Sequence, residues 1–298
     1  MAASGGTAPE ERSVAGRVRG RLAQFGRLDL SVYALYLLAI AFFVFPVLWV
    51  ASASLRPPGE LFSYPFRLLP AEISLSAYRR VFRAGMVTWL FNSTVITIVG
   101  VGSVIAVSVP AAYAFSRFEF TGRRGLLGIV LLFQMISPVI IIVPLYTVMS
   151  TLGLLRTRVG LILLYVGIQT PFSIWLLKGY FDTIPQELDY AARIDGCNRF
   201  QTLRHVLLRP VAPGIAVVAI FNTVLTWSEF VLAFTVLGSE SRLHTISIGV
   251  YKFQGQYSND WRAIAAASVV GMLPLVIVFL GLQRYFVKGL IKGSLKGQ

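Results

Sequence analysis

The chain has 298 residues, of which 56% are hydrophobic and only 13% charged, and its mean hydropathy is +0.71. A soluble domain carries about 25% charged residues, so this composition excludes a soluble protein and indicates a polytopic membrane protein. The net charge of +14 is then expected as the lysine and arginine excess of cytoplasmic loops, not as a nucleic-acid signal.

Residues 1–29 are rich in Ala, Gly, Ser, Glu and Arg and contain no apolar run. A stretch of this composition buries too little apolar surface to fold alone, and it lacks the pattern of a signal peptide. We therefore expect a disordered cytoplasmic tail, followed by one membrane domain over 30–298. Cys197 is the only cysteine, so no disulfide can form within the chain.

Six apolar stretches are each long enough to cross the membrane, because a helix needs about 20 apolar residues to span about 30 Å of hydrocarbon. Each must be helical, since unpaired backbone groups in lipid are costly. The predicted spans one to six lie within 30–55, 84–116, 125–155, 159–177, 211–237 and 263–283.

The distribution of basic residues predicts how these spans are oriented. With the N-terminus inside, 17 basic residues fall in cytoplasmic segments and ten in outer segments. Because cytoplasmic loops carry the excess of Lys and Arg, we expect both termini in the cytoplasm. The charged segment 183–214, between spans four and five, then also lies in the cytoplasm.

This segment 183–214 reads as two short helices joined by a turn. In the first helix, Leu188, Ala191 and Ala192 are spaced i, i+3 and i+4, which places them on one face. Asp195 followed by Gly196 is a helix-stop pair. The segment is therefore expected to form a charged helical surface that contacts another molecule.

The same segment resembles the cytoplasmic coupling loop of permease subunits of ABC importers. The matching residues are Ile184, Pro185, Glu187, Leu188, Ala191, Ala192, Ile194, Asp195, Gly196 and Pro213, and the departures are Tyr190, Cys197 and Arg209. The stretches FPVLWVASASLRPPGELF, FQGQYSNDW and RYFVKGLIKGSLKG are similar to the smaller permease subunit of maltose-type carbohydrate importers. The resemblance covers roughly residues 32–297.

The resemblance implies an all-α membrane protein of six transmembrane helices, with a cytoplasmic coupling helix between spans four and five. It implies a permease subunit that translocates a mono- or oligosaccharide across the bacterial cytoplasmic membrane by alternating access. The implied partners are a homologous second permease, in a heterodimer, two ABC ATPase subunits that hold ATP and Mg, and an extracytoplasmic sugar-binding protein. No cofactor, nucleic acid or metal is implied for this chain.

The residues that the resemblance assigns to ATPase coupling are Glu187, Leu188, Asp189, Ala191, Ala192, Asp195 and Gly196. Of these, the apolar Leu188, Ala191 and Ala192 are expected to enter a groove of the ATPase. The carboxylates of Glu187 and Asp189 are expected to pair with basic residues on the rim of that groove. Gly196 is expected in a left-handed conformation at the turn.

A polar stripe in span five has two readings. Asn222, Thr226 and Glu229 are spaced i, i+4 and i+7, and Trp227 lies beside them. Ionisable residues inside a span usually face a bundle interior or an aqueous path. The stripe therefore either lines the path of the sugar or locks span five to a neighbouring helix, with about 0.6 kcal/mol for each hydrogen bond.

The outer loop between spans five and six interleaves aromatic and amide side chains, namely Tyr251, Phe253, Gln254, Gln256 and Tyr257. Aromatic faces combined with amides are typical of sugar sites, so this loop is a candidate contact for a sugar or a sugar-loaded binding protein. The alternative is an aromatic belt at the membrane interface.

No catalytic machinery is visible in the sequence. It has no G-x-x-x-x-G-K-[ST] phosphate loop, and His205 and His244 are isolated from other metal-ligating residues. We therefore predict a transport subunit and not an enzyme. The same machinery for a polyol or glycerol phosphate is an alternative, and an ion-coupled secondary transporter is a second one, although such carriers commonly show midplane ion sites and internal repeats.

Overall fold

The computed structural model describes the backbone of residues 10–62, 64, 67–137, 139–238, 240, 242–255 and 259–294, and the side chains within 31–283 with the same gaps. Over these residues the chain is helical, and the isolated bridge between Gln254 and Asn259 is the only β-pairing. The helices are α1 (Glu10–Ser54), α2 (Ser76–Arg83), α3 (Met86–Arg117), α4 (Arg123–Met135), α5 (Ile142–Thr151), α6 (Arg158–Asp182), α7 (Glu187–Ile194), α8 (Arg199–Gln201), the π-helical segment η1 (Thr202–Leu207), α9 (Leu208–Ser228), α10 (Val231–Leu237), α11 (Ile246–Tyr251) and α12 (Trp261–Ser294).

Five helical segments of the described chain are long and apolar enough to cross a membrane. They are Ser31–Ser54, Met86–Arg117, Arg158–Asp182, Arg199–Ser228 and Trp261–Gln283. Four of them coincide with the predicted spans one, two, four and six, and Arg199–Ser228 covers the first part of the predicted span five, 211–237. The all-helical prediction is thus confirmed for the described residues, and the predicted spans one, two, four and six appear as continuous helices, whereas span five is divided at Glu229 between α9 and α10.

The third predicted span, 125–155, is divided in the structure. Its first half is the 13-residue α4 and its second half the 10-residue α5. At 1.5 Å per residue, α4 is about 20 Å long and too short to cross the membrane alone. The backbone leaves the helix at Ile136, which is extended. Ser137 comes directly before a proline, and such a residue is disfavoured in the helical conformation.

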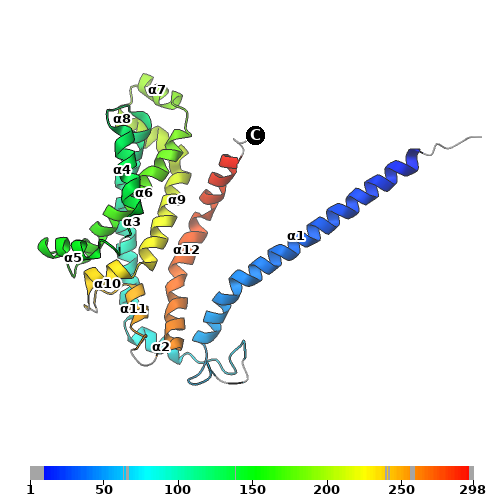
Figure 1. Ribbon diagram of the computed structural model, residues 1–298, viewed down its shortest axis with the longest axis vertical. Helices are drawn as coiled ribbons and strands as arrows, with labels where there is room; N and C mark the ends of the chain where they lie inside the picture. The colour runs from blue at the N-terminus through cyan, green and yellow to red at the C-terminus, as the bar shows by residue number, and fades with distance from the viewer. Residues whose placement is uncertain are drawn as a thin grey trace, which may run out of the picture.

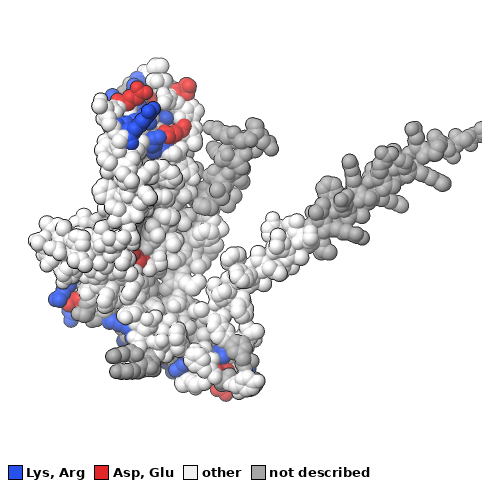
Figure 2. Space-filling view, in the orientation of Figure 1, with Lys and Arg blue, Asp and Glu red and all other residues white. Residues whose placement is uncertain are grey.

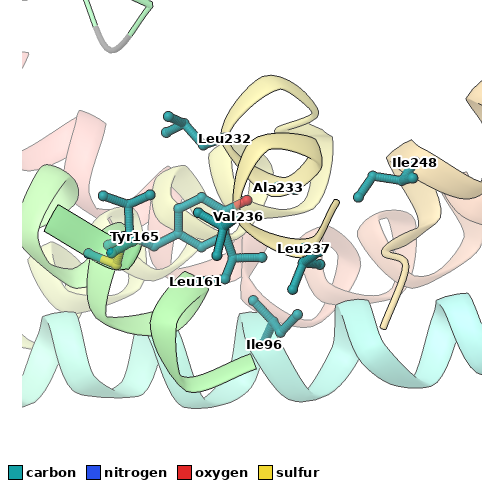
Figure 3. Packing of buried hydrophobic residues seen from close by; sticks show 10 residues of the cluster. Ile96, Leu161, Tyr165, Leu232, Ala233, Val236, Leu237 and Ile248 are labelled. Atoms are coloured by element: carbon teal, nitrogen blue, oxygen red, sulfur yellow. The ribbon is translucent and has the colours of Figure 1, made fainter. Parts of the chain in front are cut away.

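The bundle is built around α3 and α6, which pack along each other and against α9, and α12 packs against α9 (Figure 1). Three buried apolar clusters hold it together. One of them surrounds Tyr165 and joins α6 and α10 to Ile96 of α3 (Figure 3). A second contains Phe181 and Leu207 at the end of the bundle that carries α7, and a third surrounds Trp89 at the opposite end.

Helix α1 leans away from this bundle and contacts α12 near its own C-terminal end (Figure 1). None of its apolar membrane-spanning window is buried. The helix already begins at Glu10, whereas the sequence led us to expect no regular structure before residue 30. The difference has a local cause, because Ala, Arg, Leu, Gln and Glu are strong helix formers and are frequent in this part of the chain.

Candidate functional site

Helix α7 lies across one end of the bundle, together with α8, and we call this the coupling end (Figure 1). Charged side chains gather at both ends of the visible face, with one acidic patch between them (Figure 2). Helix α7 ends in a left-handed turn at Gly196, whose φ is +81°, as predicted. The amide of Cys197 donates to the carbonyl of Ala192 at 2.9 Å, which satisfies a carbonyl at the helix end.

The next short helix begins with a capping box. Asn198 Oδ1 accepts a hydrogen bond from the amide of Gln201 at 2.9 Å, and Gln201 Oε1 accepts one from the amide of Asn198 at 2.8 Å. These reciprocal bonds satisfy two amides that have no partner inside the helix. The sequence between the two membrane helices therefore specifies two short helices and the turn between them.

The two faces of α7 differ in what they touch. Asp189 and Ala192 point inward and are only 4% and 3% exposed. Leu188, Ala191 and Ile194 point outward, and Ile194 is 87% exposed. Three further residues that the resemblance assigns to coupling, Glu187, Asp195 and Gly196, are also exposed. The predicted apolar face consisted of Leu188, Ala191 and Ala192. In the structure Ala192 is buried, and the outward apolar face consists of Leu188, Ala191 and Ile194.

Asp189 is held inside the chain, and this corrects the expectation that it faces the rim of a partner. Arg117 Nε lies 2.9 Å from Asp189 Oδ2, and the Tyr113 hydroxyl donates to Asp189 Oδ1 at 3.0 Å. Arg117 Nη2 also donates to the carbonyl of Ile184 at 2.8 Å. Sequence reasoning counted Arg117 only as a cytoplasmic charge, because a partner 72 residues away leaves no local signal.

The polar stripe of span five faces α6. Asn222 Nδ2 donates to Ser173 Oγ at 2.9 Å, and Gln169 Nε2 donates to Thr226 Oγ1 at 3.0 Å. All four side chains are buried. Gln169 and Ser173 are spaced i and i+4, so one side of α6 carries the matching polar groups. For Asn222 and Thr226 the geometry therefore favours the interhelical lock among the two readings of the stripe.

Glu229 sits at the break between α9 and α10, where its own backbone is extended. Its Oε1 accepts from the amide of Leu232 and its Oε2 from the amide of Ala233, both at 2.8 Å. The hydroxyl of Tyr165 on α6 also donates to Oε2 at 2.8 Å. Glu229 thus caps α10 and ties it to α6.

Trp227 is buried and bonds to a third helix. Its indole Nε1 donates to the carbonyl of Gly271 on α12 at 3.0 Å. Trp227 therefore joins α9 to α12, whereas its stripe neighbours join α9 to α6.

Three predicted contact residues of the outer loop lie within the described chain. Tyr251 and Gln254 are exposed, while Phe253 is half-buried and packs edge-on against Trp89 with ring centroids 6.1 Å apart. The remaining two, Gln256 and Tyr257, lie outside the described residues.

A hollow of about 470 Å³ opens beside this loop, between the residues after α1 and the start of α12. Phe253, Trp261 and Arg80 are among the residues that line it. Arg80 and Asp260 form an ion pair of 2.7 Å at its wall. The sequence pattern of the loop indicated the aromatic residues here and the carboxylate of Asp260, but not its partner Arg80.

A family model described as the binding-protein-dependent transport system inner membrane component matches residues 98–292. The chain belongs to this family. It is therefore a multi-pass component of the inner membrane and a transport subunit of an ABC importer, as the resemblance of the coupling loop implied.

Individual relatives match over most of their length. The trehalose transport system permease protein SugB of Mycobacterium tuberculosis is 33% identical over 87% of this chain and 95% of its own. The diacetylchitobiose uptake system permease protein DasC of Streptomyces coelicolor is 31% identical over 92% of this chain and 98% of its own.

A solved structure shares the fold. It is a chain of a bacterial ABC transporter involved in the import of the acidic polysaccharide alginate. The two chains superpose with a TM-score of 0.72 over 95% of this chain and 100% of that one, at 24% identity.

Proposed function

We propose that this chain is one permease subunit of an ATP-driven importer that moves a mono- or oligosaccharide across the cytoplasmic membrane by alternating access. The observation that carries the proposal is the near full-length similarity to permeases named for trehalose and diacetylchitobiose uptake. A polyol or glycerol phosphate would use the same machinery. The binding experiment below distinguishes these solutes.

The proposed assembly contains a second, homologous permease, two ABC ATPase subunits that bind ATP and Mg, and an extracytoplasmic sugar-binding protein. The exposed apolar surface of α1 and α4 supports a second permease in the membrane, since Phe42, Phe43, Leu132 and Phe133 are all more than 60% exposed. A heterodimer agrees with the resemblance to the smaller maltose-type subunit.

In this assembly we place six spans in the membrane, with α4 and α5 together forming the third. Both termini and the coupling end then lie in the cytoplasm, in accord with the excess of basic residues in those segments. This orientation brings α7 to the side on which ATP is hydrolysed.

The outward face of α7 is the surface that we propose for the ATPase. Leu188, Ala191 and Ile194 form a short apolar row, and Glu187 at its start supplies a charge. A short amphipathic helix that lays such a row into a groove is a common mode of recognition. Ala192 does not belong to this row, so a substitution there changes the packing of the chain itself.

The assembly is tested by purifying the tagged chain from native membranes in mild detergent and identifying its partners by mass spectrometry. We expect an ABC ATPase, a second permease and a binding protein, and we expect that binding protein to bind a sugar in a panel that includes polyols and glycerol phosphate. A chain that is purified alone and transports on an ion gradient would overturn the proposal.

The docking face is tested with Ala191→Asp, compared with Ala191→Ser as the matched control. A carboxylate in the middle of the apolar row must be desolvated on docking, whereas the small hydroxyl fits in nearly the same volume. We expect Ala191→Asp alone to lose the ATPase on purification while the chain stays in the membrane. Normal retention of the ATPase would show that it docks elsewhere.

A further inference from the structure

The coupling end contains a junction that joins helices distant in the sequence. Helix α7 is connected by the chain to α6 on one side and to α9 on the other. Its buried carboxylate, however, bonds to neither of them. Asp189 bonds to Tyr113 and Arg117 in the last two turns of α3.

The junction is dry and highly directional. The side chains of Arg117 and Asp189 are each 6% exposed, so that water screens their attraction weakly. The guanidinium uses a second nitrogen, Nη2, to hold the carbonyl of Ile184 in front of α7. Arg117 therefore holds both α7 and the backbone segment that leads into it. We call Arg117 and Asp189 the α3–α7 clamp.

Two further contacts tie the same region to the end of α3. Ser116 Oγ donates to Asp182 Oδ1 at the end of α6 at 2.6 Å. The guanidinium carbon of Arg199, on α8, lies 4.4 Å from the centre of the Phe118 ring, a cation–π distance. The end of α3 is thus bonded to α6, α7 and α8, and it is the common attachment point of the coupling end.

We propose that the α3–α7 clamp passes displacement of the coupling helix to α3, so that α3 moves with α7 during the transport cycle. The proposal rests on the proposed function, in which an ATPase displaces α7. Helix α3 packs along α6 and against α9. A displacement of α7 then moves these three helices as one body and does not merely bend the segment that connects α6 to α9. Arg117 and Asp189 are positioning residues in this account, since they act through α7.

The alternative is a clamp that only stabilises the loop. Both accounts expect a less stable protein when the ion pair is broken, because a buried charge is left without its partner. Only force transmission predicts that ATP hydrolysis continues while transport falls. The ratio of sugar transported to ATP hydrolysed separates them.

The first experiment uses the complete transporter in proteoliposomes, with ATPase subunits, second permease and sugar-loaded binding protein, and compares wild type with Asp189→Asn. Coupling free energies between sites usually correspond to factors of about 5–150, so we expect the variant to lose roughly tenfold in sugar transported per ATP. Lys178→Gln is the matched control, because it removes the ion pair of 2.5 Å within α6 at the same end. An unchanged ratio in Asp189→Asn would overturn the proposal.

The second experiment leaves the clamp intact and tests whether the end of α3 and α8 move apart during the transport cycle. Phe118→Cys and Arg199→Cys are combined with Cys197→Ser and joined by a short bifunctional thiol reagent. If the coupling end stays fixed to α3 throughout the cycle, the crosslinked transporter takes up sugar as fast as the uncrosslinked one. Inhibition by the crosslink would show that α3 and α8 move apart and would overturn the proposal, even if Asp189→Asn failed to reach the membrane.

Failure of the proposed function gives a different result. In that case the wild-type chain does not retain an ATPase and shows no ATP-dependent uptake, whatever residue stands at position 189. Failure of the clamp alone leaves wild-type coupling intact and the Asp189→Asn ratio unchanged.

Discussion

Replacing Glu229 tests whether its carboxylate supports the fold or contacts the solute. Its two oxygens accept the amides of Leu232 and Ala233 at the start of α10 and the hydroxyl of the buried Tyr165. In Glu229→Ala, loss of the cap costs about 1 kcal/mol. The Tyr165 hydroxyl, left without an acceptor, costs about a further 2 kcal/mol.

Glu229→Gln is expected to have a smaller effect than the alanine variant. Its amide oxygen still caps one backbone N–H and its NH₂ group donates to the Tyr165 hydroxyl, but one amide of α10 loses its acceptor. The expected loss is about 1 kcal/mol. With roughly 2 °C of apparent melting temperature per kcal/mol for a chain of this size, we expect falls of about 6 °C for alanine and about 2 °C for glutamine.

The assay is the thermal unfolding of the purified transporter in detergent, read beside sugar uptake in proteoliposomes. Ser228→Ala is the matched control, because the neighbouring hydroxyl is exposed and donates to the carbonyl of Val224 within its own helix. A Glu229→Gln transporter as stable as wild type but unable to transport would refute this reasoning. That result would support the alternative, in which Glu229 lines the path of the solute.

Three further predictions concern other parts of the chain. Gly249→Ala places a Cβ within 2.2 Å of the Trp89 ring, and we expect this overpacking to cost about 1–3 kcal/mol in thermal unfolding. Burial lowers the pKa of His244 below its usual 6.5. The unfolded chain therefore binds a proton below about pH 6.5 that the folded chain does not, so stability falls as the pH is lowered through that value and His244→Gln weakens this dependence. A double-mutant cycle of Gln169→Leu and Thr226→Val is expected to show a coupling of about 0.6 kcal/mol.

Each of these three predictions has a control or an outcome that would contradict it. Gly167→Ala adds a Cβ that meets no atom within 4 Å, so a destabilisation equal to that of Gly249→Ala would rule out overpacking as the cause. An unchanged pH dependence in His244→Gln would show that another group is responsible for it. Additive effects in the cycle would show that the bond between α6 and α9 contributes nothing.

The sequence predicts the helical class and most spans because the constraint on them is local. A run of apolar residues between charges must be helical in lipid whatever surrounds it. The left-handed turn at Gly196 could be predicted for the same reason, since a positive φ favours glycine in any context. The division of the span at 125–155 was missed, because apolar residues continue through Ser137 and hydropathy does not register the break in the helix.

Pairings between distant segments could not be predicted. The stripe of Asn222 and Thr226 was visible, but its two readings differ only in what lies opposite, and that is Gln169 and Ser173 on another helix. Asp189 presents the same difficulty. Its charge pointed to a partner, and nothing near it in the chain shows that this partner is its own Arg117.

The clamp also explains how so short a helix can present a defined surface. Isolated helices of fewer than about 12 residues are marginal in water, and α7 has eight. Its inward residues Asp189 and Ala192 are spaced i and i+3, while Leu188 and Ala191 follow the same spacing on the outer side. The inner pair therefore holds the helix in shape and the outer row remains free for a partner. Substitutions of Asp189 should then change whether α3 moves with α7. Substitutions of Ala191 should change whether the ATPase can bind and displace α7.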